Sequence, residues 1–163
     1  MDPGREQHGA MSKDMEQHHY RMLAINLCLS LIIMYVAMFA MIWSWGEFIH
    51  NVNFFSMALV MWAPMSAVMM MTMRSMYRNA KLNAALYALF ALVLLLSFIG
   101  IREQSFVGDR QFLRSMIPHH SGAILMCEKA RLADPEIKQL CGDIIASQEA
   151  EIAQMKALLE RKR

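Results

Sequence analysis

Three windows of about 20 residues contain no charged side chain, and they constrain the fold more than any other feature of the sequence. They cover residues 22–42, 54–73 and 82–101. At 1.5 Å per residue, a helix of about 20 residues crosses a hydrocarbon layer roughly 30 Å thick. A helix of a soluble bundle would carry a polar face, which these windows lack. The sequence therefore predicts an all-α protein with three transmembrane helices.

Basic residues near the windows predict the orientation in the membrane. Three of them precede the first window and three lie between the second and third windows: Arg5, Lys13, Arg21, Arg74, Arg78 and Lys81. The segment 43–53 has none. Because basic segments stay in the cytoplasm, we expect a cytoplasmic N-terminus and an extracytoplasmic segment after the third window. The expected organisation is a polar tail (1–21), a transmembrane domain (22–101) and a periplasmic segment (102–163) of a bacterial inner-membrane protein.

The polar tail has no apolar periodicity, so we expect it to be disordered. It contains five side chains that could hold a metal weakly on the cytoplasmic side, namely His8, Met11, Met15, His18 and His19. A weak metal-binding tail and a merely solvated one remain equally compatible with this pattern. The formal net charge of +2 is too small to indicate a nucleic-acid partner.

The segment after the third window predicts a helical hairpin. A first helix is expected over 110–131, with Asp109 as its N-cap, and Pro118 should either kink it or restart it. Asp134 and Pro135 are typical of a second helix start, and its apolar stripe continues to about Glu160. A hairpin of some 50 residues buries little core alone. We therefore expect a second copy to complete a four-helix bundle, with docking onto the membrane domain as the alternative.

The hairpin contains soft metal ligands at helical spacing. Met116, His119 and His120 stand within five residues, and Met126 and Cys127 follow two turns later. An antiparallel second helix brings Cys141 level with Cys127 and brings Met155 near Met116. Thioether and imidazole ligands with little carboxylate favour copper, especially Cu(I). Core packing is the ordinary role of such Met and Cys residues, and it stays open.

Cys127 and Cys141 should face each other across the hairpin with Cα atoms within about 7 Å. They are predicted either to ligate copper as thiolates or to form a disulfide beside the site.

Methionine is unusually frequent, with 18 residues in the chain. Five of them recur every fourth residue in the second window: Met57, Met61, Met65, Met69 and Met73. We favour gap-filling between helices as the role of this methionine ridge, because Met adapts to irregular cavities. A thioether ladder for Cu(I) in the membrane is the alternative.

The hairpin resembles the family known as domain of unknown function 305, whose members include bacterial periplasmic copper-binding proteins. The resemblance spans 109–159 and rests on Asp109, Phe112, the run 116–120 (Met-Ile-Pro-His-His), 122–124 (Gly-Ala-Ile), Met126, Pro135, Gln148, Glu151, Ile152 and Met155. It implies a ferritin-like helical bundle that binds copper through Met and His, and it does not imply an enzyme. Ser121, Cys127 and Cys141 depart from the common pattern of the family.

Together these features predict a membrane-anchored copper-binding protein that sequesters or hands over Cu(I) for copper tolerance or homeostasis. The expected metal ligands are Met116, His119, His120, Met126 and Met155, with Cys127 and Cys141 as thiolates or a disulfide. The expected partners are copper, membrane lipid and a second copy of the chain. The alternatives are a metal-dependent membrane enzyme or oxidase that uses His119, His120 and Glu151, and a purely structural helical module.

Overall fold

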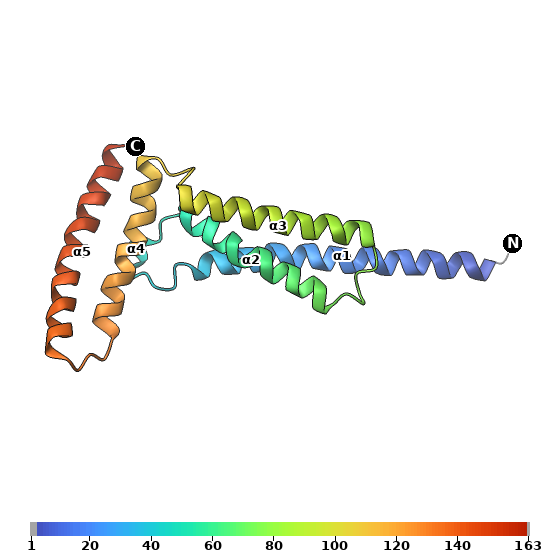
Figure 1. The fold of residues 1–163 in the computed structure, drawn as a ribbon, viewed down its shortest axis with the longest axis horizontal. Coiled ribbons are helices and arrows are strands. Elements are labelled where there is room, and N and C mark those ends of the chain that lie inside the picture. The colour runs from blue at the N-terminus through green and yellow to red at the C-terminus, as the bar shows by residue number, and fades with distance from the viewer. Residues whose placement is uncertain (1–2, 163) are drawn as a thin grey trace. The chain divides into compact units, whose positions relative to one another are not determined.

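The computed structural model describes residues 3–162, with side chains described from Met15 onward, and it is helical without a strand in that range. The elements are α1 (Pro3–Ala37), the short 3-10 helix η1 (Trp45–Glu47), α2 (Val52–Thr72), α3 (Ala80–Glu103), α4 (Asp109–Lys129) and α5 (Pro135–Arg161) (Figure 1). Three segments are long and apolar enough to cross a membrane: Met15–Ala37, Val52–Thr72 and Ala80–Glu103. The predicted fold class of three such helices followed by a helical hairpin is confirmed.

The N-terminal segment differs from the expectation of disorder, because α1 already begins at Pro3. Polarity says little about helix formation here, since Glu, Gln, Arg, Lys and Met are all good helix formers. Pro3 also suits the first position of a helix. The side chains of His8 and Met11 lie outside the described residues.

The chain forms two compact units. The first comprises residues 1–34 and 58–98, and the second comprises residues 35–57 and 99–163. Their boundaries differ from the expected segments, because the connection between α1 and α2 belongs to the same unit as the hairpin. Each unit is described by itself below.

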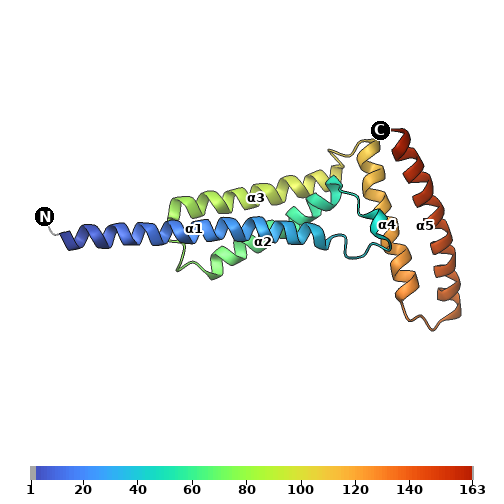
Figure 2. The same ribbon diagram turned by 180° about the vertical axis from the view of Figure 1, so that it is seen from behind.

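In the first unit, parts of α1, α2 and α3 run side by side (Figures 1 and 2) around an apolar core. The core residues are Leu23, Ala63, Met70, Tyr77 and Phe90. Trp62 Nε1 donates a hydrogen bond to the Leu27 carbonyl at 2.8 Å, and Tyr20 Oη donates to Asn83 Oδ1 at 2.8 Å. Such interhelical hydrogen bonds satisfy polar groups that have no water partner in a hydrocarbon layer.

The methionine ridge is not the packing element that we favoured. Met57, Met61, Met65 and Met73 are exposed, and only Met69 is half-buried. The core instead uses Met70, one residue off the ridge, which is buried. A spacing of four residues identifies one face of a helix, but it does not say whether that face points toward neighbouring helices.

In the second unit, α4 and α5 form an antiparallel helical pair (Figure 2). Asp134 caps α5 as predicted, because its side chain accepts hydrogen bonds from the backbone N–H groups of Glu136 and Ile137. The core of the pair comprises Leu113, Ile117, Ile124, Ile152 and Met155.

Helix α1 ends at Ala37, five residues before the end of the first apolar window. The chain turns there, and Phe39 becomes buried with its ring 4.2 Å from that of Phe48 and 5.0 Å from that of Phe54. Apolar composition alone did not mark this helix end, because residues 38–42 are as apolar as the helix before them. The turn gives the second unit an aromatic cluster next to the hairpin.

Helix α4 runs without interruption through Pro118, so His119 and His120 lie in the middle of a helix rather than in a first turn. Pro118 has no N–H group for the carbonyl four residues earlier. Its ring is buried in the second unit. Burial of the ring offsets the lost hydrogen bond and keeps both flanking helical segments in one helix.

Candidate metal site on the helical hairpin

His120 and Glu151 form the polar centre of the hairpin. His120 Nδ1 lies 3.0 Å from Glu151 Oε2, and only 13% of the His120 side chain is exposed. Ser147, one turn earlier on α5, donates a hydrogen bond from Oγ to Glu151 Oε1 at 2.9 Å. The Nδ1 to Oε2 distance is short, but the angles do not meet hydrogen-bond criteria. The contact becomes an ion pair only when His120 is protonated, and a small ring rotation would convert it into a hydrogen bond.

The electrostatics of His120 favour its neutral form. Burial lowers the pKa of His120 below its ordinary value of 6.5, Glu151 raises it by charge attraction, and His119 lowers it further. Desolvation is the largest of these effects, since it penalises the imidazolium cation. A neutral imidazole with a carboxylate beside Nδ1 leaves Nε2 as the atom able to bind a metal ion.

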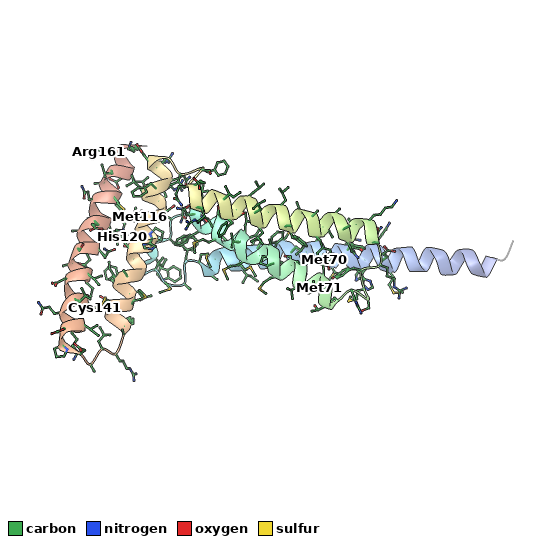
Figure 3. The ribbon with its side chains drawn as sticks, in the orientation of Figure 1. Met70, Met71, Met116, His120, Cys141 and Arg161 are labelled. Atoms are coloured by element: carbon green, nitrogen blue, oxygen red, sulfur yellow. A yellow bond between two sulfur atoms is a disulfide. The ribbon has the colours of Figure 1, made fainter. Side chains whose placement is uncertain are left out.

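Two thioethers lie close to this pair in the sequence and in the core. Met116 is one helical turn before His120 on α4 (Figure 3), and Met155 is one turn after Glu151 on α5. Met155 is a buried core residue, and Met116 is half-buried and packs against the same core cluster. Met116 and Met155 thus belong to the same core, each one helical turn from a member of the His120–Glu151 pair.

The other stripe of predicted ligands points elsewhere. His119 and Met126 are both exposed, and Met126 has 55% of its surface accessible. His119 is near His120 only through adjacency, with ring centroids 6.1 Å apart. Of the predicted Met and His ligands, Met116, His120 and Met155 are therefore at least partly buried in the hairpin, whereas His119 and Met126 are exposed.

Cys127 and Cys141 are joined by a disulfide, with Cα atoms 5.2 Å apart. The predicted register of the hairpin is confirmed by this bond. Of the two alternatives, the structure contains the disulfide, and disulfide sulfurs cannot act as thiolate ligands. The two cysteines are therefore not thiolate ligands in this structure. They link the helices at the loop end of the hairpin (Figure 3).

Sequence reasoning missed Glu47, a buried carboxylate that tethers the α1–α2 connection to the hairpin. Glu47 is only 2% exposed, and Lys156 Nζ on α5 donates to its Oε1 at 3.1 Å. Ser121 Oγ on α4 donates to Oε2 of the same carboxylate, and Trp43 N donates to Ser121 Oγ at 2.6 Å. The sequence did contain a signal for Glu47, because Ser44 and Glu47 have the spacing of a capping box, which the structure forms around η1.

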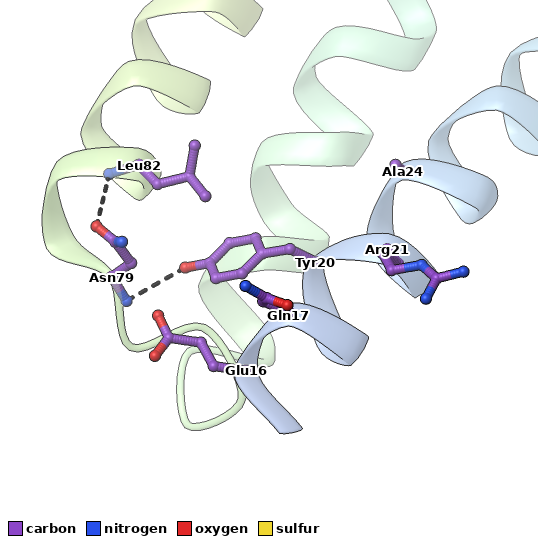
Figure 4. Close-up of a pocket in the computed structure, with 7 residues that line it drawn as sticks. All are labelled: Glu16, Gln17, Tyr20, Arg21, Ala24, Asn79 and Leu82. Atoms are coloured by element: carbon purple, nitrogen blue, oxygen red, sulfur yellow. Dashed lines mark hydrogen bonds between the residues drawn. The ribbon is translucent and has the colours of Figure 1, made fainter. Parts of the chain in front are cut away.

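A hollow of about 630 Å³ in the first unit lies between α1 and the start of α3 (Figure 4). Tyr20 Oη accepts a hydrogen bond from the backbone N–H of Asn79 there, at 3.2 Å. Its wall is formed by Glu16, Gln17, Tyr20, Arg21, Ala24, Asn79 and Leu82. It contains no thioether, thiol or imidazole, so it adds nothing to a soft-metal site.

Within the described residues, no group of three or more His, Cys, Asp or Glu side chains is close enough to hold a metal ion. Zinc and the hard divalent cations depend on such groups. Among the described residues, the hairpin core instead contains thioether sulfur at Met116 and Met155, a soft donor.

Fold and site together define an all-helical protein in which three helices able to cross a membrane precede a disulfide-linked hairpin. The chain belongs to the family called domain of unknown function (DUF305), whose sequence profile matches residues 56–159. The match begins well before Asp109, so it includes most of α2 and all of α3 as well as the hairpin that carried the resemblance.

One relative is an uncharacterized protein, L153, of Acanthamoeba polyphaga mimivirus. It is 35% identical over 120 residues, which cover 72% of this chain and 77% of the relative. No solved structure matches the chain.

Proposed function

We propose that this protein is a membrane-anchored copper-binding protein that sequesters or hands over Cu(I) through Met116, His120 and Met155. The observation that carries the proposal is the position of Glu151 Oε2, 3.0 Å from Nδ1 of a mostly buried, neutral-favouring His120. A carboxylate at the non-ligating nitrogen is the usual support of a metal-binding histidine. Two thioethers on the same interior face then make the donor set soft.

The biological role that fits this donor set is copper tolerance or homeostasis in a bacterial inner membrane. The basic residues of the α2–α3 connection support a cytoplasmic side there, which puts the hairpin in the periplasm. A disulfide between α4 and α5 fits an oxidising compartment.

A second copy of the chain remains part of the proposal. The hairpin exposes four large apolar side chains: Phe112, Met126, Ile137 and Leu140. A second hairpin would cover them in a four-helix bundle. Cross-linking of the detergent-solubilised protein should trap a dimer through cysteines introduced at Met126 or Leu140, and a protein that stays monomeric would remove the second copy from the proposal.

An enzymatic role is not part of the proposal. A metal-dependent hydrolase or oxidase at His119, His120 and Glu151 would need a free base. Glu151 instead lies against His120 and accepts a hydrogen bond from Ser147, which suits a carboxylate that orients an imidazole.

The test is an anaerobic Cu(I) titration of the full-length protein in detergent against a competing chelator. The variant Met116→Leu/His120→Gln should lose the tight site, because only amide oxygen and water remain near Met155 as additional ligands. Both replacements are good helix formers of similar size, so helix content should stay unchanged.

The matched control is His119→Gln/Met126→Leu, which also removes one imidazole and one thioether but from the exposed stripe. It should keep the parental affinity. Loss of copper in this control with retention in the first variant would move the site to the outer face of α4. Retention in both would refute a copper site on the hairpin.

A further inference from the structure

A cavity of about 350 Å³ lies at the end of the hairpin where α4 begins and α5 ends. Its wall combines Gly46 of η1 with Arg110 and Arg114 of α4 and with Lys156 and Glu160 of α5. All of these residues belong to the second unit. Three cationic side chains and one carboxylate thus share one concave surface.

Neither arginine is in an ion pair within the described residues. They are four residues apart on α4, so both guanidinium groups lie on the same side of the helix. The charged contacts of the described residues are those of Lys156 with Glu47, of Lys162 with Asp109 and, when protonated, of His120 with Glu151. Glu160 is the one carboxylate on the wall of the cavity, against three cations. Two like charges at this spacing repel each other unless an anion lies between them.

Lys156 contributes a third donor with a fixed position. Its ammonium group is held 3.1 Å from the buried Glu47 carboxylate, while 41% of the side chain remains accessible. The cation is therefore anchored at the cavity wall rather than free on a flexible stem. An ammonium has three donors, so Lys156 can serve Glu47 and a ligand together.

We propose that this cavity binds a phosphate-bearing anion, held by the Arg110 and Arg114 guanidinium groups with Lys156 as a third donor. Guanidinium presents a planar fork of donors that matches phosphate oxygens in a bidentate manner. The cavity is at the small end of the range for ligand sites, which suits a phosphate group and its nearest substituent. The proposal is independent of copper binding.

The expected source of this phosphate is an anionic phospholipid headgroup. Arg110 is seven residues after Glu103, where the third candidate span ends, so it lies at most about 25 Å from that point even along a fully extended chain. Trp45, next to the cavity wall at Gly46, is 87% exposed, and Phe106 in the α3–α4 connection is 74% exposed. Tryptophan is typical of the headgroup level of a membrane, and an exposed phenylalanine adds apolar surface there.

The experiment places full-length protein in nanodiscs of equal parts phosphatidylcholine and phosphatidylglycerol and counts the lipids retained in native mass spectrometry. The parent should retain phosphatidylglycerol in preference to phosphatidylcholine. Arg110→Gln/Arg114→Gln should reduce that preference by roughly tenfold or more, since each cation near a membrane surface contributes substantially to anionic lipid binding. Lys129→Gln/Arg131→Gln, which removes the same charge at the other end of the hairpin, should leave the preference unchanged.

A second arm titrates sodium phosphate into the protein in nanodiscs of phosphatidylcholine alone and measures heat. Binding that disappears in Arg110→Gln/Arg114→Gln, without a lipid preference in the first arm, would support the site and make soluble phosphate its ligand. Equal loss of phosphatidylglycerol in both double variants with no phosphate binding would overturn the proposal, because nonspecific charge would then explain the lipid. Cu(I) affinity, measured on the same samples, should not change in either variant.

Discussion

Methionine has different surroundings in the two compact units of this protein. Met70 in the first unit and Met155 in the second are both buried core residues. Met70 lies among Leu23, Ala63, Tyr77 and Phe90. Met155 lies in the core of the hairpin, and Met116 packs against the same core. Met116 is one helical turn from His120, and Met155 is one turn from Glu151. Thioether sulfur becomes a candidate ligand only where an oriented imidazole accompanies it.

In the first unit, several thioethers line a cavity that has no imidazole on its wall. A cavity of about 210 Å³ between α1 and α2 is lined by Met34, Met65 and Met69. Its polar neighbours Ser30 and Ser66 donate their hydroxyl groups to backbone carbonyls of their own helices. The frequency of methionine is therefore a weaker guide to metal binding than the position of a single histidine.

The largest effect that would test this comparison is expected from paired leucine substitutions of the two buried methionines. Met155→Leu should lower Cu(I) affinity by at least about 100-fold, because loss of a ligand should cost no less than loss of a residue that only supports one. Met70→Leu should leave affinity unchanged. Both replacements conserve volume, so neither should cost more than about 1.5 kcal/mol of stability. Chelator competition measures the affinities, and equal losses in the two variants would break the comparison.

A smaller effect is expected from pH. A ligating imidazole must be neutral, and burial lowers the pKa of His120 from its ordinary value of 6.5, so protons compete with copper only below that value. Cu(I) affinity should be constant above pH 6.5 and then fall by up to about tenfold per pH unit as His120 becomes protonated. Thioethers do not titrate.

His120→Gln should abolish this pH dependence together with tight binding, whereas His119→Gln should retain both. An affinity that already falls well above pH 6.5 would contradict the assignment of His120 as the titrating ligand.

The hydrogen bonds of the buried Glu47 are expected to contribute to the stability of the second unit and not to copper binding. Glu47→Gln should lower the stability of the second unit by about 1–2 kcal/mol, because the amide leaves the Lys156 ammonium without its carboxylate. Lys162→Gln breaks the exposed pair with Asp109 and should leave stability unchanged within error. Thermal unfolding in detergent, followed by circular dichroism, compares the two. Equal midpoints would show that the Glu47 network contributes nothing.

The smallest effect is expected from the methionine ridge. Met57→Leu/Met61→Leu/Met65→Leu should change neither the number of Cu(I) ions bound nor their affinity, since these exposed thioethers have no imidazole on their face. Loss of one bound Cu(I) per chain would show that the ridge carries metal and would remove the contrast between the two units.

Local signals predicted the elements of this fold well. The three apolar windows correspond to the three candidate spans, and Asp134 with Pro135 marks the start of α5. These features depend on neighbouring residues alone: apolar length, a capping side chain and a proline at the first helical position. The register that joins Cys127 to Cys141 was also predictable, because a short connection fixes how two antiparallel helices align.

The candidate site was predictable only in part. The spacing of Met116, His119, His120 and Met126 places all four on neighbouring stripes of one helix, and periodicity cannot tell which stripe is buried. Packing against α5 buries Met116 and His120 and leaves His119 and Met126 exposed.

The sequence by itself thus determined the helices, the cap of α5 and the residues capable of binding a soft metal, since these depend on contacts within a few residues. The predicted cap of α4 was wrong, because Asp109 is the first residue of that helix and Gly108 is its N-cap, without a capping side chain. Only the tertiary structure decided that His120 faces Glu151 and that Glu47 reaches Ser121 and Lys156, 74 and 109 positions away. The physical reason is that a carboxylate is buried only where several donors converge on it. Those donors come from elements that are distant in the chain and meet only after it has folded.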